Sequence, residues 1–462
     1  MNSNTALFLF VVFHGCLGYY NLEKEPDCFC QLQGKVDECT CNIDTVDHLN
    51  NVKIYPRLRS LLEKDYFRYF KVNLKRECPF WTDDSRCAMR FCHVESCEEN
   101  EIPAGLKGHA KPKDMYSKEV NEDCNEHHNS LHLVDKTLSE KAQKDIDLWA
   151  KHDDASDNFC IIDEYDEEAE YVDLKLNPER YTGYKGKSAK RIWDSIYLEN
   201  CFRPEKAKSF DVYIQNGKLN DMCLEERVFY RAISGLHASI NIHLTSIYLL
   251  SENSLTDPNG EWGPNVAEFQ RRFSSETTNG EGPNWLRNLY FVYLLELRAL
   301  AKAAPYLEKE EYYTGNENED WDTQMAIKDL LSVIKQFPDH FDEKVMFNGD
   351  VQAKNLKNEF REHFRNVSRI MDCVGCDKCK VWGKLQTQGL GTALKILFSG
   401  KFDNIESVDA NNKKIFQLHR NEIVALINAI GRLSTSIYKL DDFKERLSNT
   451  GNKVKITDNI FK

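Results

Sequence analysis

The sequence predicts a mainly α-helical protein built as one large domain. Five stretches, all beyond residue 226, repeat apolar residues at three- and four-residue steps, the spacing that gives a helix one buried face. Strand-like segments do not alternate with these helices, and no internal repeat or long linker divides the chain. A chain of 462 residues can bury a large core without help from disulfides.

The first 18 residues are interpreted as a secretory signal peptide. The apolar run "ALFLFVVF" (6–13) is too short to span a bilayer, and small residues follow it up to Gly18, where we expect cleavage. A sequon at Asn366 predicts glycosylation, which fits a chain that enters the secretory route. The mature protein, residues 19–462, is therefore expected to be a soluble protein of an oxidising compartment.

Cysteine pairs mark the start of the mature chain. Residues 19–45 contain "CFC" and "CTC" about ten residues apart, a spacing that suggests a hairpin stapled by Cys28–Cys41 and Cys30–Cys39. The chain has 16 cysteines, and loss of Cys16 with the signal peptide leaves 15. An odd number in an oxidising compartment requires at least one thiol that is free or exchanging.

A segment near the start of the chain is the least regular part of the sequence. Residues 78–130 are rich in Cys, Gly, Pro, His and charge, which favours a mobile loop. The acidic stretch "DEYDEEAEYVDL" (163–174) is interpreted as a solvated loop in preference to an acidic docking patch. A net charge of −13 argues against nucleic acid as a partner, because phosphates favour basic surfaces.

The helical core is placed at residues 227–400, with a further helix beyond it. Ile233, Leu236 and Ile240 lie on one stripe of the first helix, and the other four stretches follow the same spacing. The five predicted helices cover residues 227–250, 286–303, 323–337, 355–371 and 420–440.

The cluster "CVGCDKC" (373–379) carries the chemistry. We expect no metal, because a zinc site usually takes two separated cysteine pairs and no partner CxxC occurs in the mature chain. Cys376 and Cys379 would share one face of a helix, and a tightened first turn would let them form a reducible disulfide. Cys373 is rotated away and could bridge a distant segment. The alternative is that all three are structural cysteines with partners elsewhere.

A disulfide that partner proteins reduce to a dithiol must pass the electrons on, and flavin is the usual carrier from thiols to oxygen. "GLGTAL" (389–394) imitates a dinucleotide-binding turn, but Leu394 replaces the third glycine and no strand precedes it. Any flavin is therefore expected in a helical, non-Rossmann pocket.

These features resemble the endoplasmic reticulum oxidoreductin-1 family, FAD-dependent thiol oxidases that reoxidise protein disulfide isomerase. Five segments carry the resemblance in the family's order: "CPFWTDDSRCAMRFC", "NPERYTGYKG", "ISGLHASIN", "GEGPNWLRNLYF" and "MDCVGCDKCKVWGKLQTQGLGTALKILF". The resemblance implies an enzyme of the endoplasmic reticulum lumen that uses FAD and molecular oxygen, forms hydrogen peroxide and drives oxidative protein folding. It also allows a peripheral association with the lumenal face of the membrane.

The resemblance assigns roles to the cysteines. It implies that Cys87 and Cys92 form an outer shuttle disulfide, which passes electrons to the inner active-site pair Cys376–Cys379 and from there to FAD. In relatives with feedback control the shuttle cysteines re-pair as Cys87–Cys124 and Cys92–Cys97. Four structural disulfides are implied: Cys28–Cys41, Cys30–Cys39, Cys78–Cys373 and Cys201–Cys223. Cys160 is then the odd thiol.

The resemblance also assigns the flavin site. It implies contacts from six residues: Arg180, Thr182, Trp193, Ser234, His237 and Arg272. The arginine forks suit a pyrophosphate and the tryptophan suits a ring system. Where some relatives carry an arginine after "GEGP", this chain has Trp285, and the nearest arginine is Arg287.

Two other classes of function compete with an oxidase. A thioredoxin-like thiol–disulfide isomerase would also use CxxC, but it needs a βαβ core and holds no flavin. A secreted binding module would have inert disulfides, so its function would survive loss of Cys379.

Overall fold

The computed structural model describes residues 43–81, 92–108, 158–180, 186–200, 202, 223–250, 261–335, 341–349, 351–399 and 416–449. Several predicted features lie outside these residues: the signal peptide, the hairpin cysteines Cys28, Cys30, Cys39 and Cys41, and most of the loop at 78–130 with Cys87 and Cys124. Thr182 and Cys201 also lie outside them.

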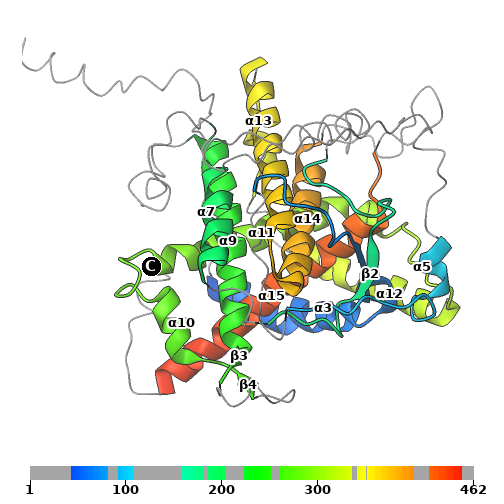
Figure 1. Cartoon of the computed structure of the whole chain (residues 1–462), viewed down its shortest axis with the longest axis horizontal. Helices are drawn as coiled ribbons and strands as arrows, with labels where there is room; N and C mark the ends of the chain where they lie inside the picture. The colour runs from blue at the N-terminus through cyan, green and yellow to red at the C-terminus, as the bar shows by residue number, and fades with distance from the viewer. Residues whose placement is uncertain are drawn as a thin grey trace, which may run out of the picture.

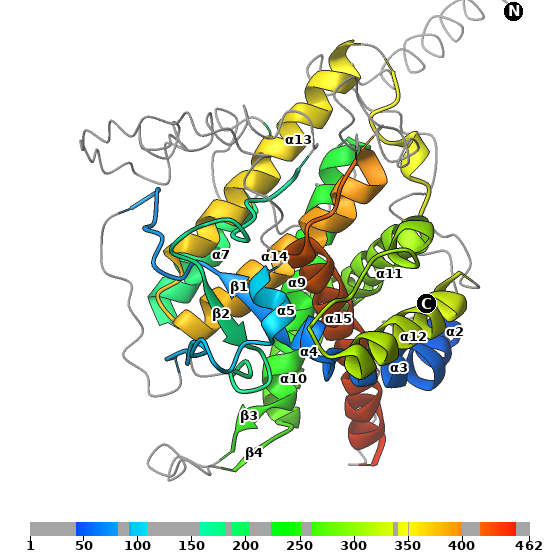
Figure 2. The same cartoon turned by 90° about the vertical axis from the view of Figure 1, so that its right-hand side faces the viewer.

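Four long helices form the centre of the molecule (Figures 1 and 2). They are α9 (Leu224–Ser246), α11 (Gly282–Leu307), α14 (Asp377–Phe398) and α15 (Arg420–Asn449). Helix α9 packs mainly on α11, and α14 packs mainly on α15. In Figure 1, α15 (red) runs obliquely past the lower ends of α9 and α14. The predicted mainly helical fold is confirmed, and the helical core extends beyond residue 400 because it includes α15.

Shorter helices surround this centre. Two flank the side that carries the cysteine cluster, α7 (Gly186–Leu198) and α13 (Val351–Ile370), and a 3₁₀ turn (Met371–Cys373) joins α13 to α14. The others are α2 (Ile43–Leu49), a π-helical turn (Asn50–Ile54), α3 (Tyr55–Leu62), α4 (Asp65–Arg68), α5 (Ala104–Gly108), α10 (Val266–Phe273), α12 (Glu317–Ile334) and a 3₁₀ turn (Glu343–Val345).

Glycine lets α9 and α11 approach closely. A Cβ atom built on Gly235 would lie 2.2 Å from the backbone oxygen of Asn288 and 2.6 Å from a methyl carbon of Val292. Any larger residue at 235 would therefore force the two helices apart. This close approach sets the distance between two walls of the cavity described below.

Glycine and a buried ion pair fasten α14 to α15. A Cβ atom on Gly389 would lie 2.4 Å from the Cβ atom of Ala429. Further along, the Lys395 ammonium lies 2.7 Å from the Glu422 carboxylate, and both side chains are buried. The sequence "GLGTAL" thus lies inside one continuous helix, and the prediction that it is no dinucleotide-binding turn is confirmed.

Two small antiparallel sheets complete the described elements. Strand β1 (Tyr69–Val72) pairs with β2 (Glu170–Asp173), and β3 (Tyr248–Leu249) pairs with β4 (Trp262–Gly263). None of the described helices has the length and apolar character that crossing a membrane requires.

Strand β2 shows that the prediction of a solvated loop for residues 163–174 was wrong for part of this stretch. Glu167 and Glu168 are exposed in a turn, but Glu170–Asp173 form β2 and both Asp163 and Asp173 are buried. Asp163 forms ion pairs with Arg76 and Lys384, and Asp173 pairs with Arg68. Charge composition alone misled the prediction, because these carboxylates are compensated by cations distant in sequence.

Candidate functional site

The inner cysteine pair lies at the start of α14. Cys376 is the N-cap residue of this helix, and Cys379 lies in its first turn. Both side chains are buried and both are thiols. A hydrogen bond from Cys379 is the main cause that lowers the pKa of Cys376, and backbone N–H groups of the helix start contribute. A helix N-terminus favours a thiolate, so this position suits thiol–disulfide exchange.

One outer cysteine meets this pair. Cys92 is buried and packs in one cluster with Cys376 and Cys379, against Val374. The backbone N–H of Lys378, which lies between the inner cysteines, donates a 2.9 Å hydrogen bond to the carbonyl oxygen of Cys92. Cys92 takes part in a disulfide.

Cys97, the predicted regulatory partner of Cys92, is a thiol here. Burial is the largest cause that raises its pKa to about 11, and the charge of Asp173 raises it further. The Cys92–Cys97 pairing is therefore not formed in this structure. That Cys97 acts in a regulatory switch remains a prediction.

A disulfide joins two segments that are far apart in the sequence, the segment at Cys78 and the 3₁₀ turn before α14. Cys78 and Cys373 are bonded with a Cα–Cα distance of 4.4 Å across 295 residues of sequence, which is the pairing the resemblance implies. Cys223 is also disulfide-bonded, while Cys201, the partner that the resemblance implies for it, lies outside the described residues. Cys160 is a buried thiol.

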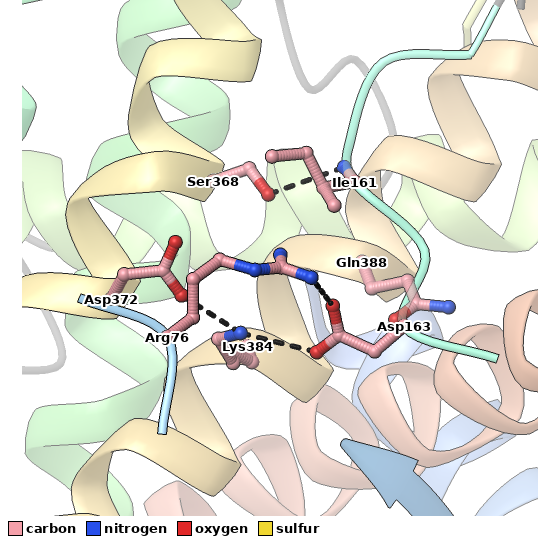
Figure 3. A pocket seen from close by; sticks show the side chains of 7 residues that line it. All are labelled: Arg76, Ile161, Asp163, Ser368, Asp372, Lys384 and Gln388. Atoms are coloured by element: carbon pink, nitrogen blue, oxygen red, sulfur yellow. Dashed lines mark hydrogen bonds and ion pairs between the residues drawn. The ribbon is translucent and has the colours of Figure 1, made fainter. Parts of the chain in front are cut away.

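Charged side chains gather around a small cavity that α13 and α14 help to form (Figure 3). Two of them, Arg76 and Asp372, are close in sequence to the bonded Cys78 and Cys373. Arg76 lies 3.0 Å from Asp163, and Lys384 on α14 lies 3.1 Å from Asp163 and 2.8 Å from Asp372. The cavity among them measures only about 10 Å³, which is at most the space of one water molecule. We interpret this cluster as a structural clasp between the Arg76 segment and α14, not as a ligand site.

A larger cavity of about 240 Å³ opens between α7, α9, α10 and α11. Three of the six predicted flavin contacts line it: Trp193 from α7, and Ser234 and His237 from α9. Aromatic side chains make up most of the remaining wall, namely Tyr197, Tyr230, Phe273 and Trp285. The prediction that Ser234 and His237 face one pocket agrees with this arrangement.

Hydrogen bonds and ring stacking hold polar side chains of the described cavity wall in place. The Nδ1 atom of His237 lies 2.9 Å from the hydroxyl of Tyr197, and its ring stacks on Trp193 with centroids 3.6 Å apart. Asn288 of α11 donates a 3.0 Å hydrogen bond to the Ser234 hydroxyl. Burial, followed by the charge of Arg272, lowers the pKa of His237 to about 3, so its imidazole is neutral at physiological pH.

Arg272 lies one contact away from the cavity. Its guanidinium donates to the side-chain oxygen of Asn241, which lines the cavity, and its Nε atom donates to Glu268 at 2.7 Å. The structure therefore places Arg272 at the margin of the site. Trp285 lies in the cavity wall itself, whereas Arg287 donates to Asn284 at 3.3 Å.

Arg180 lies toward the cysteine pair. Its guanidinium stacks over the ring of Trp262 with 4.7 Å to the centroid, and burial lowers its pKa. Burial is the largest cause that lowers the pKa of Lys378, beside the inner cysteines, and of His243 on α9, and the charge of Arg180 contributes to both. The charge of Arg180 therefore acts both on the start of α14, beside the inner pair, and on α9, which lines the cavity.

Sequence reasoning missed several wall residues that helical spacing could have found. Tyr197 follows Trp193 by four residues, and Asn241 follows His237 by four, so each shares a helix face with a predicted contact. Tyr230 precedes Ser234 by the same step. Phe273 of α10 gave no such signal, because only the packing of α10 against α9 brings it to the cavity.

Asn366, the predicted glycosylation site, lies on α13. Its amide nitrogen donates a 3.1 Å hydrogen bond to Glu199, which also lies 2.7 Å from the ring of His363. The asparagine is half-buried. Glycosylation at Asn366 remains a prediction.

Comparison with known proteins shows the family to which this chain is similar. The family model "Endoplasmic Reticulum Oxidoreductin 1 (ERO1)" matches residues 53–440. The chain is 57% identical to the Ero1-like protein of Drosophila melanogaster, covering 91% of each chain. It is 52% identical to ERO1-like protein alpha of Homo sapiens, covering 91% of this chain and 92% of that one.

A solved structure agrees with the sequence matches. The chain resembles a cysteine variant of S. cerevisiae Ero1p, with 30% identity, a TM-score of 0.57 and coverage of 88% of this chain and 98% of that one. The chain therefore belongs to the Endoplasmic Reticulum Oxidoreductin 1 family and is an oxidoreductase of oxidative protein folding.

Proposed function

We propose that the protein is a FAD-dependent thiol oxidase of the endoplasmic reticulum lumen that reoxidises protein disulfide isomerase. The observation that carries this proposal is the buried cluster of Cys92 with Cys376 and Cys379. A redox-active outer cysteine in contact with a thiol pair at a helix N-terminus is the arrangement that disulfide relay requires. A further solved structure, 26% identical to this chain, is that of an Ero1p described as a source of disulfide bonds for oxidative protein folding.

The first exchange takes place at the outer pair. A thiolate of the reduced isomerase attacks Cys87 and releases Cys92 as a thiolate. The second thiol of the isomerase then attacks the mixed disulfide, so that the isomerase leaves oxidised and Cys87 and Cys92 remain reduced. A large protein substrate needs such an outer pair, because Cys376 and Cys379 are each only 4% exposed.

The second exchange takes place inside the cluster. The Cys92 thiolate attacks Cys376 of the oxidised inner pair, and Cys379 leaves as a thiolate. Cys87 then attacks Cys92, which restores the outer disulfide and leaves Cys376 and Cys379 as a dithiol. The start of α14 stabilises the negative charge that develops on the inner sulfurs.

The aromatic cavity fits a flavin cofactor. Its walls are mainly aromatic, with a few fixed polar groups, which is the composition of sites for planar cofactors. Trp193 would stack on an aromatic ring of the cofactor there, with Ser234 and His237 beside it, while the guanidinium groups of Arg180 and Arg272 would pair with the pyrophosphate. Thr182, the sixth implied contact, lies outside the described residues. FAD, when bound, supplies the two-electron acceptor that reoxidises the inner dithiol and the route by which oxygen becomes hydrogen peroxide.

Absorbance spectroscopy tests the proposal. We expect the purified mature chain to be yellow, to bleach on anaerobic addition of reduced protein disulfide isomerase, and to recolour in air with formation of peroxide. Cys379→Ser should keep its colour but lose bleaching. A colourless protein that resists added FAD would overturn the flavin assignment.

The matched control is Cys160→Ser, which removes another buried thiol on which the relay does not depend. This variant should bleach like the unaltered chain. Bleaching that survives Cys379→Ser would exclude the inner pair as the route to the flavin.

A further inference from the structure

The segment that carries Cys92 is held as an extra strand along β2. Ser96 forms a bridge with Val172, and the backbone N–H of Cys97 donates a 2.8 Å hydrogen bond to the carbonyl oxygen of Tyr171. Strand β1 covers the other edge of β2. The position of Cys92 therefore depends on how far the pairing with β2 continues from Ser96 toward the cluster of Cys92, Cys376 and Cys379.

The backbone of β2 cannot continue the pairing with the Cys92 segment, because the strand ends at Asp173. The side chain of Asn177 takes its place. Its oxygen accepts a 2.9 Å hydrogen bond from the N–H of Glu95, and its Nδ2 donates one of 2.9 Å to the carbonyl oxygen of Glu95. An amide side chain carries the same donor and acceptor as a peptide group, so it extends the ladder toward Cys92.

Asn177 is itself fixed. It is only 1% exposed, and both its backbone N–H and its Nδ2 donate to the carbonyl oxygen of Asp173, each at 3.1 Å. A buried amide with these bonds has little freedom to rotate.

The same residue also contacts the helix of the inner pair. The indole N–H of Trp382 donates a 2.9 Å hydrogen bond to the backbone oxygen of Asn177. Trp382 follows Cys379 by three residues on α14. Asn177 thus touches the segments on both sides of the exchange, one through its side chain and one through its backbone.

We propose that Asn177 is the positioning residue that sets Cys92 against Cys376 for disulfide exchange. This inference rests on the relay proposed above. The side-chain amide holds the Cys92 segment in register, and the backbone oxygen ties that register to α14. The attack of Cys92 on Cys376 then starts from a geometry built before the sulfurs react, which raises its rate.

The positioning role can be measured as the effective concentration of the Cys92 thiol toward the Cys376 thiol. This quantity comes from the equilibrium of their disulfide with glutathione and does not depend on the cofactor. Serine at Cys87, Cys97, Cys124 and Cys379 leaves Cys92 and Cys376 to pair with each other. Anaerobic titration with glutathione then follows one balanced reaction, in which oxidised glutathione and the two thiols give the protein disulfide and two reduced glutathiones. Peptide mapping identifies the bond formed.

Asn177→Ala should lower this effective concentration about tenfold or more, because it removes the two hydrogen bonds to Glu95, three residues beyond Cys92. The matched control is Asn428→Ala. Asn428 is likewise buried, and its Nδ2 donates to the carbonyl oxygens of Phe67 and Val424, each at 2.9 Å, away from the cysteines. This control should leave the effective concentration unchanged.

Asn177→Asp decides the question if the alanine variant does not fold, since it keeps the shape and the acceptor but loses the donor to Glu95. It too should lower the effective concentration. Values equal to the reference in both Asn177 variants would overturn the positioning role and leave the relay standing. Failure of Cys92 and Cys376 to pair even in the reference background would overturn both.

Discussion

Cys376 and Cys97 are thiols of opposite acidity, although they lie in adjoining segments of one site. A hydrogen bond from Cys379 at the start of α14 lowers the pKa of Cys376, whereas burial and Asp173 raise that of Cys97 to about 11. Only a thiolate attacks a disulfide. A thiol of lowered pKa also leaves a disulfide faster, so the environment of Cys376 suits its release when Cys87 attacks the Cys92–Cys376 bond. The environment of Cys97 keeps that thiol protonated near neutral pH.

This difference predicts the reactivity of Cys97. Because its pKa is raised from 9.0 to about 11, the thiolate fraction at pH 8 should be about 100-fold lower than in the unfolded chain. Alkylation of Cys97 by iodoacetamide, followed by mass spectrometry, should be correspondingly slow in the folded protein. Its rate should keep rising tenfold per pH unit beyond pH 9. A rate that levels off near pH 9 in the folded chain would contradict the assignment.

Among the elements, the pairing of α9 with α11 shapes the aromatic cavity that we propose for the flavin. Gly235 permits the approach, while Ser234 beside it receives the hydrogen bond from Asn288 that crosses between the helices. The cavity is therefore a consequence of helix spacing. Residues that never touch a ligand can control it.

Gly235→Ala should destabilise the protein. The added Cβ atom meets backbone at 2.2 Å, so the helices must separate, at a cost of about 1–3 kcal/mol. Urea unfolding of the apoprotein measures the change, and the flavin content should fall with it.

Gly383→Ala on α14 is the matched control, because its Cβ atom meets only the side chain of Met371, at the flexible Sδ atom. The Met371 side chain must shift from a contact of 2.7 Å, which costs less than separating two helix backbones, so this variant should destabilise the protein less than Gly235→Ala does. Equal destabilisation by both substitutions would show that glycine itself, and not the helix contact, matters.

Over the whole molecule, the Cys78–Cys373 disulfide joins the N-terminal segments to the central helices. It closes a loop of 295 residues, and the charged clasp of Arg76, Asp163 and Lys384 lies next to it. The chain before residue 82 is thereby fastened next to the start of α14, where the inner pair lies. The bridge restricts the unfolded chain as well as the folded one.

Replacement of both Cys78 and Cys373 by serine should lower the free energy of unfolding by about 2–5 kcal/mol. Denaturant unfolding of the double variant against the unaltered chain, without reductant, measures this loss. The double variant avoids a stray thiol that could exchange with the relay. An unchanged unfolding midpoint would mean that the helical core and the charged clasp hold this region without the bridge.

The sequence predicted the features of the site that depend on residues close together in the chain. It did not predict those that depend on contacts between distant segments. Ser234 and His237 could be placed on one cavity because they are one helical turn apart. Asp163 and Asp173 were misplaced in a solvated loop, because their partners Arg76, Lys384 and Arg68 are distant in sequence. Asn177 gave no signal at all, since its role arises from contacts with two separate segments.

The sequence by itself determined the helical class, the family and the start of α14 at the CxxC pair, because helix periodicity and motif spacing are local properties of the chain. Only the tertiary structure decided that Cys92 meets Cys376 and Cys379, and that aromatic residues of α7, α9, α10 and α11 enclose one cavity. These contacts join segments far apart in the chain. They follow from how buried surfaces pack together, which spacing along the sequence does not specify.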